Sequence, residues 1–346
     1  MRKLVLLACC VFVVSLLPAE KITFKVMQLN IWLEGTEVSL GFEAIVNEVL
    51  KNDVDVVTFN EIQNINHTPF NERLLKALKE KGKTYYSFYA EDSGIISKYP
   101  ILSSASVYPE KADTGSIYKA IILIGDKQVA VYSSHLDYQH YACYLPRGYS
   151  GDTWKKIEKP VTNVDSILKS TRLSMRMEEI TAVIADAGKE IQKGHAVIIG
   201  GDFNEPSQLD WVESTMNLFD HHGVVVSWPV SSYLNASGFI DAYRHRYPNP
   251  VTHPGFTYPT DNPDATINKL TWAPDVDERE RIDFIYYKPV KGLKLLDVVI
   301  VGPIGCIVKN KRTEETSKDR FIKPSGVWPS DHKAVMTTFE LTTGTF

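Results

Sequence analysis

The stretch that most constrains the fold runs from residue 196 to residue 206 and reads AVIIGGDFNEP. Four apolar residues lead into two glycines, which predicts a fully buried strand that ends where another backbone approaches closely. Asp202 and Asn204 follow at once. Because side chains alternate along an extended segment, we expect these two to point the same way and Phe203 to point into the core. The strand end would then present a carboxylate beside a carboxamide, although the same residue types also build ordinary turns.

Apolar periodicity predicts further strands and helices along the chain. We expect strands over 22–30, 54–59, 94–97, 120–125, 128–133, 281–287, 293–301 and 334–341, and helices over 42–51, 73–81, 166–193 and 209–218. Alternating strands and helices, with hairpins mixed in, predict α/β layers with mixed sheets. No linker or internal repeat interrupts residues 20–346, which predicts a single domain there.

Residues 138–164 are rich in Tyr, Pro and Gly and lack the periodicity of a helix or strand. We predict a long loop. Long loops in compact domains tend to be functional. This segment is therefore a candidate for substrate contact.

The first 19 residues have the composition of a secretory signal. Arg2 and Lys3 precede an uncharged apolar run over 4–17, and Pro18-Ala19 follow it. This is the basic, apolar, small-residue order of such signals. The run is too short to span a membrane. We therefore predict export, to the periplasm or outside the cell, without lipidation at Cys9.

Export would leave two cysteines in the mature chain, Cys143 and Cys306. An oxidising compartment permits them to pair. Sequence separation says nothing about their distance, so a disulfide and two free thiols both stay open.

The chain carries a small excess of acidic residues. The whole sequence has 38 basic and 42 acidic residues, a net charge of −4; without residues 1–19, which hold two basic residues and no acid, 36 and 42 remain, a net charge of −6. Proteins held on nucleic acid by bulk charge have the opposite excess. The composition therefore favours a small or lipid-like substrate over a polymeric nucleic acid, although a local basic groove is compatible with it.

Acidic, amide and imidazole residues fall at the ends of the predicted strands. Each one alone has an ordinary structural explanation, such as a capping carboxylate or a core histidine. Ligands in layered α/β folds gather at strand ends, so these side chains can converge in space. The set comprises Asn30, Glu61, His135, Asp202, Asn204, Asp283, Asp331 and His332. We expect one site in preference to that many coincidences.

The motifs around these residues resemble the endonuclease/exonuclease/phosphatase superfamily, which has the fold of deoxyribonuclease I. They are QLN at 28–30, NEIQ at 60–63, SHL at 134–136, GDFN at 201–204, RIDFI at 281–285 and WPSDH at 328–332. Each motif is common, but the ordered set over residues 21–341 is specific. The resemblance, to secreted bacterial-type members in particular, implies an α/β (α+β) four-layer sandwich, in which two packed mixed sheets lie between outer helices.

The resemblance also implies a metal centre and a catalytic pair. Glu61, with Asp331 and Asn30 beside it, would hold a divalent cation in the oxygen-rich surroundings that Mg²⁺ prefers, with Mn²⁺ as a second candidate. His332 would act as the general base and Asp283 as its orienting partner.

Three further residues take roles from the same resemblance. Asp202 would align or deprotonate the attacking water, a role that accounts of the family divide between it and His332. Asn204 and His135 would donate to phosphoryl oxygens. The reaction implied is hydrolysis of a phosphodiester or phosphomonoester by in-line attack of an activated water.

The substrate is less constrained than the reaction. Tyr138 and Arg147 in the long loop, and Tyr258 in a segment that resembles a family region beside the pocket, are candidate substrate contacts. Two alternatives stay open. A secreted deoxyribonuclease I-like nuclease would need a basic, aromatic-lined groove. An inactive binding module on the same fold would have lost part of the constellation, yet every matched position is present.

Overall fold

The computed structural model describes residues 20–109 and 115–344. The predicted signal over residues 1–19, Cys9 included, lies outside the described residues. Across the described part of the chain, no helix has both the length and the apolar character needed to cross a membrane.

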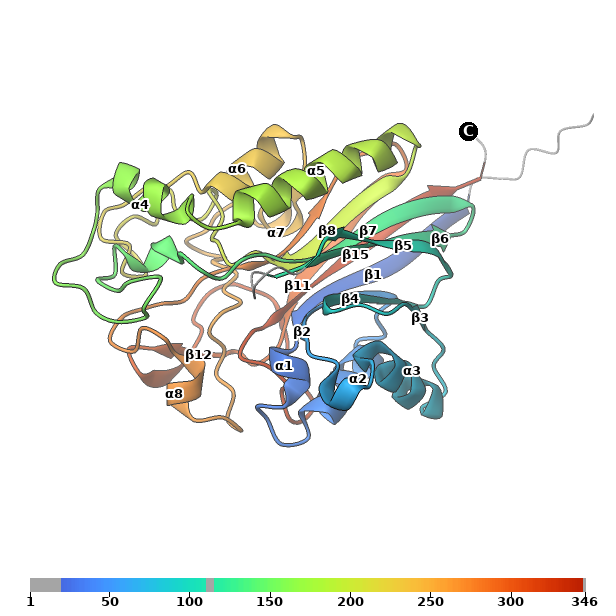
Figure 1. Cartoon of the computed structure of the whole chain (residues 1–346), viewed down its shortest axis with the longest axis horizontal. Coiled ribbons are helices and arrows are strands. Elements are labelled where there is room, and N and C mark those ends of the chain that lie inside the picture. The colour runs from blue at the N-terminus through green and yellow to red at the C-terminus, as the bar shows by residue number, and fades with distance from the viewer. Residues whose placement is uncertain (1–19, 110–114, 345–346) are drawn as a thin grey trace, which may run out of the picture.

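Strands form the centre of the molecule (Figure 1). They are β1 (Glu20–Asn30), β2 (Val56–Ile62), β3 (Tyr86–Ser87), β4 (Asp92–Ser97), β5 (Ile101–Tyr108), β6 (Ile117–Ile124), β7 (Lys127–His135), β8 (Ala196–Asp202), β9 (Ile240–Asp241), β10 (Asp283–Tyr287), β11 (Leu293–Val301), β12 (Gly305–Val308), β13 (Lys311–Glu314), β14 (Phe321–Ile322) and β15 (Ala334–Thr343). One sheet has the order β14-β11-β15-β1-β2-β4-β3, a second has the order β5-β6-β7-β8-β10-β9, and β12 and β13 form a separate hairpin. Both large sheets are mixed, because β1 and β2 are parallel, as are β7 and β8, among antiparallel neighbours.

Helices cover the outer faces of the two sheets. They are α1 (Trp32–Gly35), α2 (Gly41–Lys51), α3 (Phe70–Glu80), α4 (Val164–Thr171), α5 (Arg176–Gln192), α6 (Pro229–Ala236), α7 (Ala242–Arg246) and α8 (Ile267–Leu270), with 3₁₀ turns η1 (Ile65–His67) and η2 (Ala142–Tyr144). Figure 1 shows α2 and α3 on one side of the paired sheets and α5 and α6 on the other. The predicted four-layer architecture is confirmed.

Alternating apolar residues explain why each sheet is buried on both faces. Val26 and Ile198 lie in the core between the sheets. Their neighbours in sequence point outward: Met27 packs in the core beneath α2 and α3, and Val197 packs with Ile180 of α5. Strands that are covered on both faces read as continuous apolar runs, which is the pattern of residues 196–199.

The two glycines of β8 allow the close approach that the sequence predicts. A Cβ atom at Gly200 would lie 2.4 Å from Oγ1 of Thr58 in the facing sheet. A Cβ atom at Gly201 would lie 2.0 Å from the backbone oxygen of Ser134. Real Cβ atoms do not come this close, so larger side chains here would push the sheets or strands apart.

Two helix predictions were wrong. The predicted helix over 166–193 is two helices, α4 and α5, because the Asp137 carboxylate accepts a hydrogen bond from the Met175 nitrogen at 2.8 Å, just before α5 begins. Residues 209–218 form turns, with no helix. There Trp211 stacks on His221 with ring centroids 3.7 Å apart, and the side chain of Asp210 is bound to two buried arginines. These tertiary contacts override the local apolar spacing.

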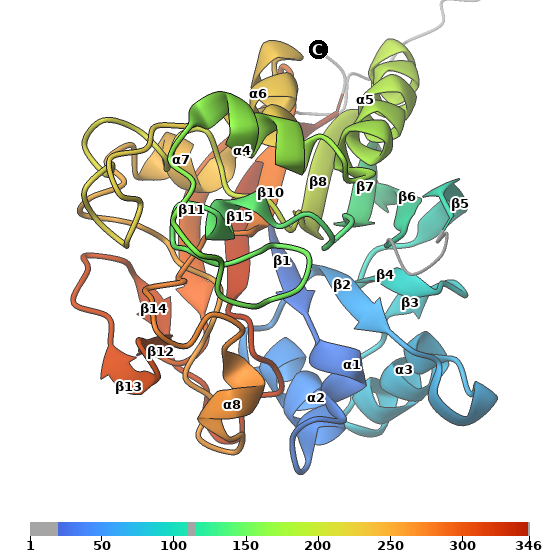
Figure 2. The ribbon, with the colours of Figure 1, turned by 60° about the vertical axis from the view of Figure 1, so that its left-hand side comes forward.

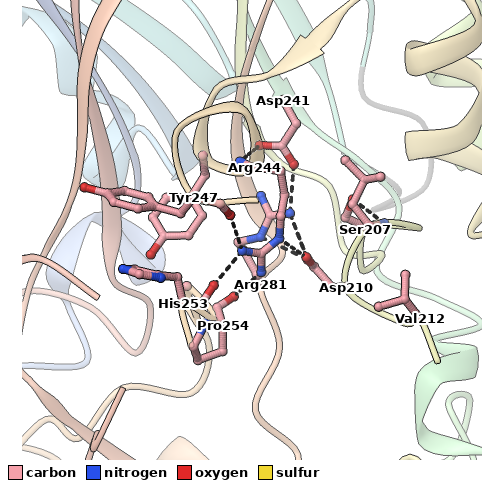
Figure 3. A network of polar contacts seen from close by, with 12 residues as sticks. Ser207, Asp210, Val212, Asp241, Arg244, Tyr247, His253, Pro254 and Arg281 are labelled. Carbon is pink, nitrogen blue, oxygen red and sulfur yellow. Dashed lines mark hydrogen bonds and ion pairs between the residues drawn. The ribbon is translucent and has the colours of Figure 1, made fainter. Parts of the chain in front are cut away.

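The two arginines form the buried network shown in Figure 3. Arg281 pairs with Asp210 and with Asp241, each at 2.8 Å, and Arg244 also binds Asp210. Arg244 donates in addition to the backbone oxygens of Tyr247, His253 and Pro254. Both guanidinium groups are buried and paired, and the network joins the turn at Asp210, the β9–α7 segment and the loop after α7 to the chain just before β10.

Strand register brings the predicted polar residues to one edge. His135, Asp202 and Asp283 are direct neighbours across β7, β8 and β10. Asn30 pairs with Asn60 across β1 and β2 in the other sheet. The Asn60 side-chain oxygen accepts from the Asp202 nitrogen at 2.8 Å, which joins the two sheets at this edge.

Candidate active site

A pocket of about 330 Å³ opens at this edge of the two sheets. Figure 2 shows the loop between β7 and α4 on the same side of the molecule. The pocket is lined by Trp32, Leu33, Glu61, Gln63, Asp92, His135, Tyr138, Tyr141, Tyr144, Trp154, Asp202, Asn204, Tyr258, Trp272, Ile282, Asp331 and His332. Predicted site residues from both sheets and from the long loop therefore share one cavity.

Asn30 connects two of the carboxylates in the pocket. Its side-chain nitrogen donates to Oε1 of Glu61 at 2.8 Å and to Oδ2 of Asp202 at 3.0 Å. Its side-chain oxygen accepts from the Trp32 nitrogen at 2.9 Å. Asn30 therefore presents its nitrogen, and not its oxygen, to the two carboxylates. Glu61 has a left-handed backbone (φ 68°) at an irregularity in the pairing of β2 with β4. Such bulges re-aim a side chain.

His332 and Asp283 form the predicted pair. Nδ1 of His332 lies 2.8 Å from Oδ2 of Asp283, and both residues are buried. Nε2 lies 3.8 Å from Oδ2 of Asp202, so these two atoms face the same space. Burial alone would lower the pKa of His332, but Asp283 and Asp202 together raise it well above its usual value. The imidazole is therefore oriented by one carboxylate and stabilised as a cation by two.

The WPSDH motif holds His332 by its backbone. The Ser330 hydroxyl accepts from the His332 nitrogen at 3.0 Å, and the Trp328 indole nitrogen donates to the His332 oxygen at 2.7 Å. Trp328 is buried beneath the loop. The motif thus fixes the loop on which both Asp331 and His332 stand.

His135 has a carboxylate partner that the sequence analysis missed. Nδ1 of His135 lies 2.7 Å from Oδ1 of Asp92, the first residue of β4. Burial lowers the pKa of His135, but the charge and hydrogen bond of Asp92, together with the charges of Asp202 and Glu61, outweigh it and raise the pKa to about 10. His135 is thus held as a cation facing the pocket, which suits a donor to anionic oxygens. Asp92 could have been found only as a strand-end carboxylate without a family motif around it.

Asp202 and Asn204 both line the pocket, but strand alternation is not the reason. β8 ends at Asp202, and Asn204 has a left-handed backbone (φ 47°). The Asn204 side-chain nitrogen donates to the Leu136 oxygen at 2.9 Å, and its backbone nitrogen donates to Oδ1 of Asp202 at 3.0 Å. Phe203 is buried in the core, as predicted. Both side chains reach the pocket as expected, but the turn after β8, and not an extended segment, places Asn204.

Asp331 completes the acidic side of the pocket. Burial first, and then the charges of Glu61 and Asp202, raise the pKa of Asp331 to about 7, although His332 opposes them. Within the described residues, Oδ1 of Asp331 is a buried oxygen without a hydrogen-bond partner. Carboxylates that repel one another, one of them with an oxygen that no donor reaches, are the surroundings in which a cation binds.

Comparison with known proteins identifies this arrangement. Residues 27–332 match the model of the Endonuclease/Exonuclease/phosphatase family. The chain belongs to this family. The Caenorhabditis elegans protein F14F9.5, described as uncharacterized, is 27% identical over 330 residues, which cover 91% of this chain and 90% of that protein. This nematode relative gives no support to the expectation of a bacterial-type member.

Solved structures of family members share the fold. Truncated TDP2 from Caenorhabditis elegans superposes with a TM-score of 0.51 at 17% identity, covering 92% of this chain and 97% of that structure. The catalytic domain of human Nocturnin gives a TM-score of 0.47 at 14% identity, covering 94% and 98%. At 17% identity, the likeness to TDP2 shows the deoxyribonuclease I-like fold alone.

Enzymes of the endonuclease/exonuclease/phosphatase family use divalent metals, and the residues present fit one. Glu61 and the unpartnered Asp331 offer hard oxygen ligands on one side of the pocket. A second set, Asp202, Asp283 and His332, has ligand atoms within 4.8 Å of one another among the described residues. An imidazole in that set suits a softer ion, and its Nδ1 is already hydrogen-bonded to Asp283. We therefore place the candidate metal at Glu61 and Asp331.

Arg147 is not placed where it could contact a substrate in this pocket. It is buried, and its Nη1 pairs with Oε1 of Glu280 at 2.7 Å. Its other contacts include the Phe219 oxygen at 3.0 Å and the face of Trp211. The structure contradicts the expected substrate contact, because this cation supports the loop from within.

Tyr138 and Tyr258 do line the pocket. Tyr138 is 39% exposed, whereas Tyr258 is buried with its ring centroid 4.9 Å from that of His332. Among the described residues, the Tyr258 hydroxyl is a buried polar group without a hydrogen-bond partner. Trp154 lies in the loop that the sequence marks for substrate contact, whereas no pattern around Trp272 distinguishes it from a core tryptophan.

Cys143 and Cys306 are buried and free. Burial raises the pKa of both thiols, to about 12 for Cys306. Thiols of this kind are inert. The sequence left both a disulfide and two free thiols open, and the structure has two free thiols.

Proposed function

We propose that this protein is a divalent-metal-dependent phosphoesterase that hydrolyses a small or lipid-like phosphodiester or phosphomonoester by in-line attack of an activated water. The observation that carries the proposal is one pocket in which His332, oriented by Asp283, faces Asp202 across 3.8 Å, with Glu61 and Asp331 in the same lining. The nearby carboxylates favour the protonated imidazole, so His332 can accept a proton once a cation bound to the anionic ligands offsets their charge.

The chain's own residues supply the proton transfer. Asp283 holds the His332 imidazole through Nδ1, which leaves Nε2 toward the pocket. Asp202 and His332 together bracket the space in which a water would be aligned and deprotonated. The protonated imidazole formed in that step is stabilised by both carboxylates.

Two further residues of the same pocket supply positive charge and a donor. His135, which Asp92 helps to keep protonated, and Tyr258, whose hydroxyl has no partner among the described residues, line the pocket and can donate to phosphoryl oxygens. Asn204, also predicted as such a donor, lines the pocket, but its amide is bonded to Leu136. A divalent cation held by Glu61 and Asp331 would stabilise charge on the phosphoryl and leaving oxygens.

The test compares metal-dependent hydrolysis in wild type and Glu61→Gln. We expect bis-(p-nitrophenyl) phosphate or p-nitrophenyl phosphate to be hydrolysed in Mg²⁺, and turnover to stop in excess EDTA. Glu61→Gln preserves shape and removes one ligand charge, so activity is expected to fall by at least about 100-fold at unchanged secondary structure. Glu72→Gln, a change in the first turn of α3, is the matched control. Full turnover in EDTA, or an active Glu61→Gln protein, would refute the metal role.

A secreted nuclease on the same centre is the second candidate. The pocket does contain the aromatic lining that such a function needs. Its lining within the described residues contains no Lys or Arg, so the basic groove of a polymer-binding enzyme is missing there. The small-substrate proposal predicts only a mild loss of activity between about 50 and 200 mM salt, where multiple phosphate contacts would cost roughly 1,000-fold in affinity.

A further inference from the structure

The pocket has an aromatic wall that the chemistry above does not use. We define this wall by Tyr138, Tyr141, Tyr144, Trp154 and Trp272, which all line the cavity. Tyr138 and Trp272 are 39% and 53% exposed. Large aromatic surface left in water beside a catalytic centre is typical of a binding surface.

Trp154 is the centre of the aromatic wall. Its ring lies nearly parallel to that of Tyr138, with an interplanar angle of 18° and centroids 6.4 Å apart. The ring of Trp272 lies 5.7 Å from it on another side, tilted by 45°. Tyr144 meets it edge-on at 5.8 Å. Rings packed on one another in this way present faces and edges along one surface, and they do not enclose a cage.

A buried network holds Tyr138 in place. Nη1 of Arg176 donates to the backbone oxygens of Asp137 and Gln139, which flank Tyr138, at 2.6 and 2.7 Å. The Asp137 nitrogen donates to the buried Glu179 at 3.0 Å. The loop is therefore fixed from inside the protein while its aromatic side chain faces outward.

A second buried carboxylate holds the Trp272 segment against the same wall. Glu278 accepts hydrogen bonds from the nitrogens of Trp272 at 3.2 Å and Ala273 at 3.0 Å. It also accepts from the Tyr144 hydroxyl, which links the two halves of the wall. A surface ordered before binding loses little conformational entropy when a ligand arrives.

Charge limits what the aromatic wall can accept. Among the described lining residues there are four carboxylates and no Lys or Arg. The nearby Lys156 is paired with Asp275 at 2.7 Å and does not line the pocket. Apart from His135 and His332, which the proposed function assigns to the phosphate and the attacking water, a second anionic group on the substrate would find no cation in the lining, whereas an uncharged flat ring would find aromatic faces.

We propose that the aromatic wall is a subsite for an uncharged flat ring carried by the phosphoester, as in an ester of a nucleoside monophosphate, and that the ring stacks on Trp272 and Tyr138 while the phosphate lies at Glu61 and Asp331. This inference rests on the proposed function, because the phosphate position comes from it. Stacking supplies the affinity that Lys and Arg supply in polymer-binding enzymes.

Binding of adenosine 5′-monophosphate and ribose 5-phosphate tests the proposal, because these ligands share phosphate and sugar and differ only in the flat base. Calorimetry in Mg²⁺ on a His332→Ala background prevents turnover. We expect the base to tighten binding by at least about tenfold, as stacking on aromatic side chains does. Phenyl phosphate should likewise bind more tightly than cyclohexyl phosphate, which has equal charge and similar size but is not flat.

Variants locate the effect on the aromatic wall. Trp272→Leu and Tyr138→Leu should reduce the preference for the base to less than threefold and leave ribose 5-phosphate binding unchanged. Trp272→Phe should keep most of the preference. Tyr86→Leu, at an equally exposed tyrosine in β3 outside the pocket, should change nothing.

Equal affinity for the two sugar phosphates would overturn the proposal, as would a base preference that survives Trp272→Leu combined with Tyr138→Leu. Tighter binding of choline phosphate than of adenosine 5′-monophosphate would also overturn it, since the wall would then recognise a cation. Hydrolysis of bis-(p-nitrophenyl) phosphate without any base preference would refute the subsite alone. A base preference in a protein that hydrolyses no ester would refute the catalytic proposal alone.

Discussion

Arg147 and Glu280 give a direct test of the buried support beneath the long loop. Their charged atoms lie 2.7 Å apart, and the residues are 3% and 2% exposed. Arg147→Met removes the cation and leaves Glu280 buried without a counter-charge. Breaking a buried pair in this way costs about 3–5 kcal/mol in the free energy of unfolding. The role that the sequence suggests, contact with an anionic substrate, predicts a different effect, a higher KM when Arg147 is replaced.

The double variant Arg147→Met with Glu280→Gln separates the loss of the charge pair from the loss of packing. A neutral amide at residue 280 can still accept from the Trp211 indole, whose bond to Glu280 measures 3.2 Å. We therefore expect the double variant to be about 2 kcal/mol more stable than Arg147→Met. Urea denaturation at pH 7.5, followed by tryptophan fluorescence, measures both values.

The pH dependence of this loss has a predicted sign. Burial raises the pKa of Glu280 to about 7 even with Arg147 present to lower it. Without Arg147 the carboxyl can take up a proton, so the loss in Arg147→Met should shrink as pH falls from 7.5 to 5.5. KM should change by less than about threefold while the variant is folded, because Arg147 does not line the pocket. A loss of less than about 1 kcal/mol in the free energy of unfolding of Arg147→Met would refute the reasoning. Losses for Arg147→Met and Glu280→Gln that simply add in the double variant would also refute it.

Two further predictions concern catalysis and pH. His332→Ala and Asp283→Asn should each lower kcat far more than they raise KM, and the double variant should be much less impaired than the product of the single effects. Steady-state kinetics measure all three variants. Independent losses would mean that the two residues do not work as a unit. Burial raises the pKa of Glu179 to about 8, although the hydrogen bond from the Asp137 nitrogen opposes it. Between about pH 4.5 and 8 the native state therefore keeps a proton that the unfolded state releases, and stability should fall by about 1.4 kcal/mol per pH unit as pH rises. Glu179→Gln should remove this slope between pH 5.5 and 7.5 in urea denaturation; an unchanged slope would contradict the assignment.

Much of the fold followed from local patterns. The run at 196–199, its two glycines and the alternating strands and helices have causes that act within a few residues: burial of apolar side chains, the absence of a Cβ atom, and backbone periodicity. The six family motifs, taken in their order along the chain, then predicted which polar side chains lie at strand ends. His332 with Asp283 and Glu61 with Asp331 were expected from these motifs. Glu61, Asp331 and His332 line one pocket, and Asp283 is hydrogen-bonded to His332.

Only the tertiary structure decided the roles of residues whose partners are distant in sequence. In the sequence Arg147 is a cation in a loop, yet in the structure it is buried and paired with Glu280, which lies 133 positions away. Asp92 carries no motif, but strand pairing brings it to His135. Trp154 and Trp272 become one surface because Glu278 and Arg176 fix two loops side by side. Composition and spacing report which groups a chain carries, whereas the pairing of a buried charge, and hence its pKa and its function, depends on contacts that form only when the sheets pack.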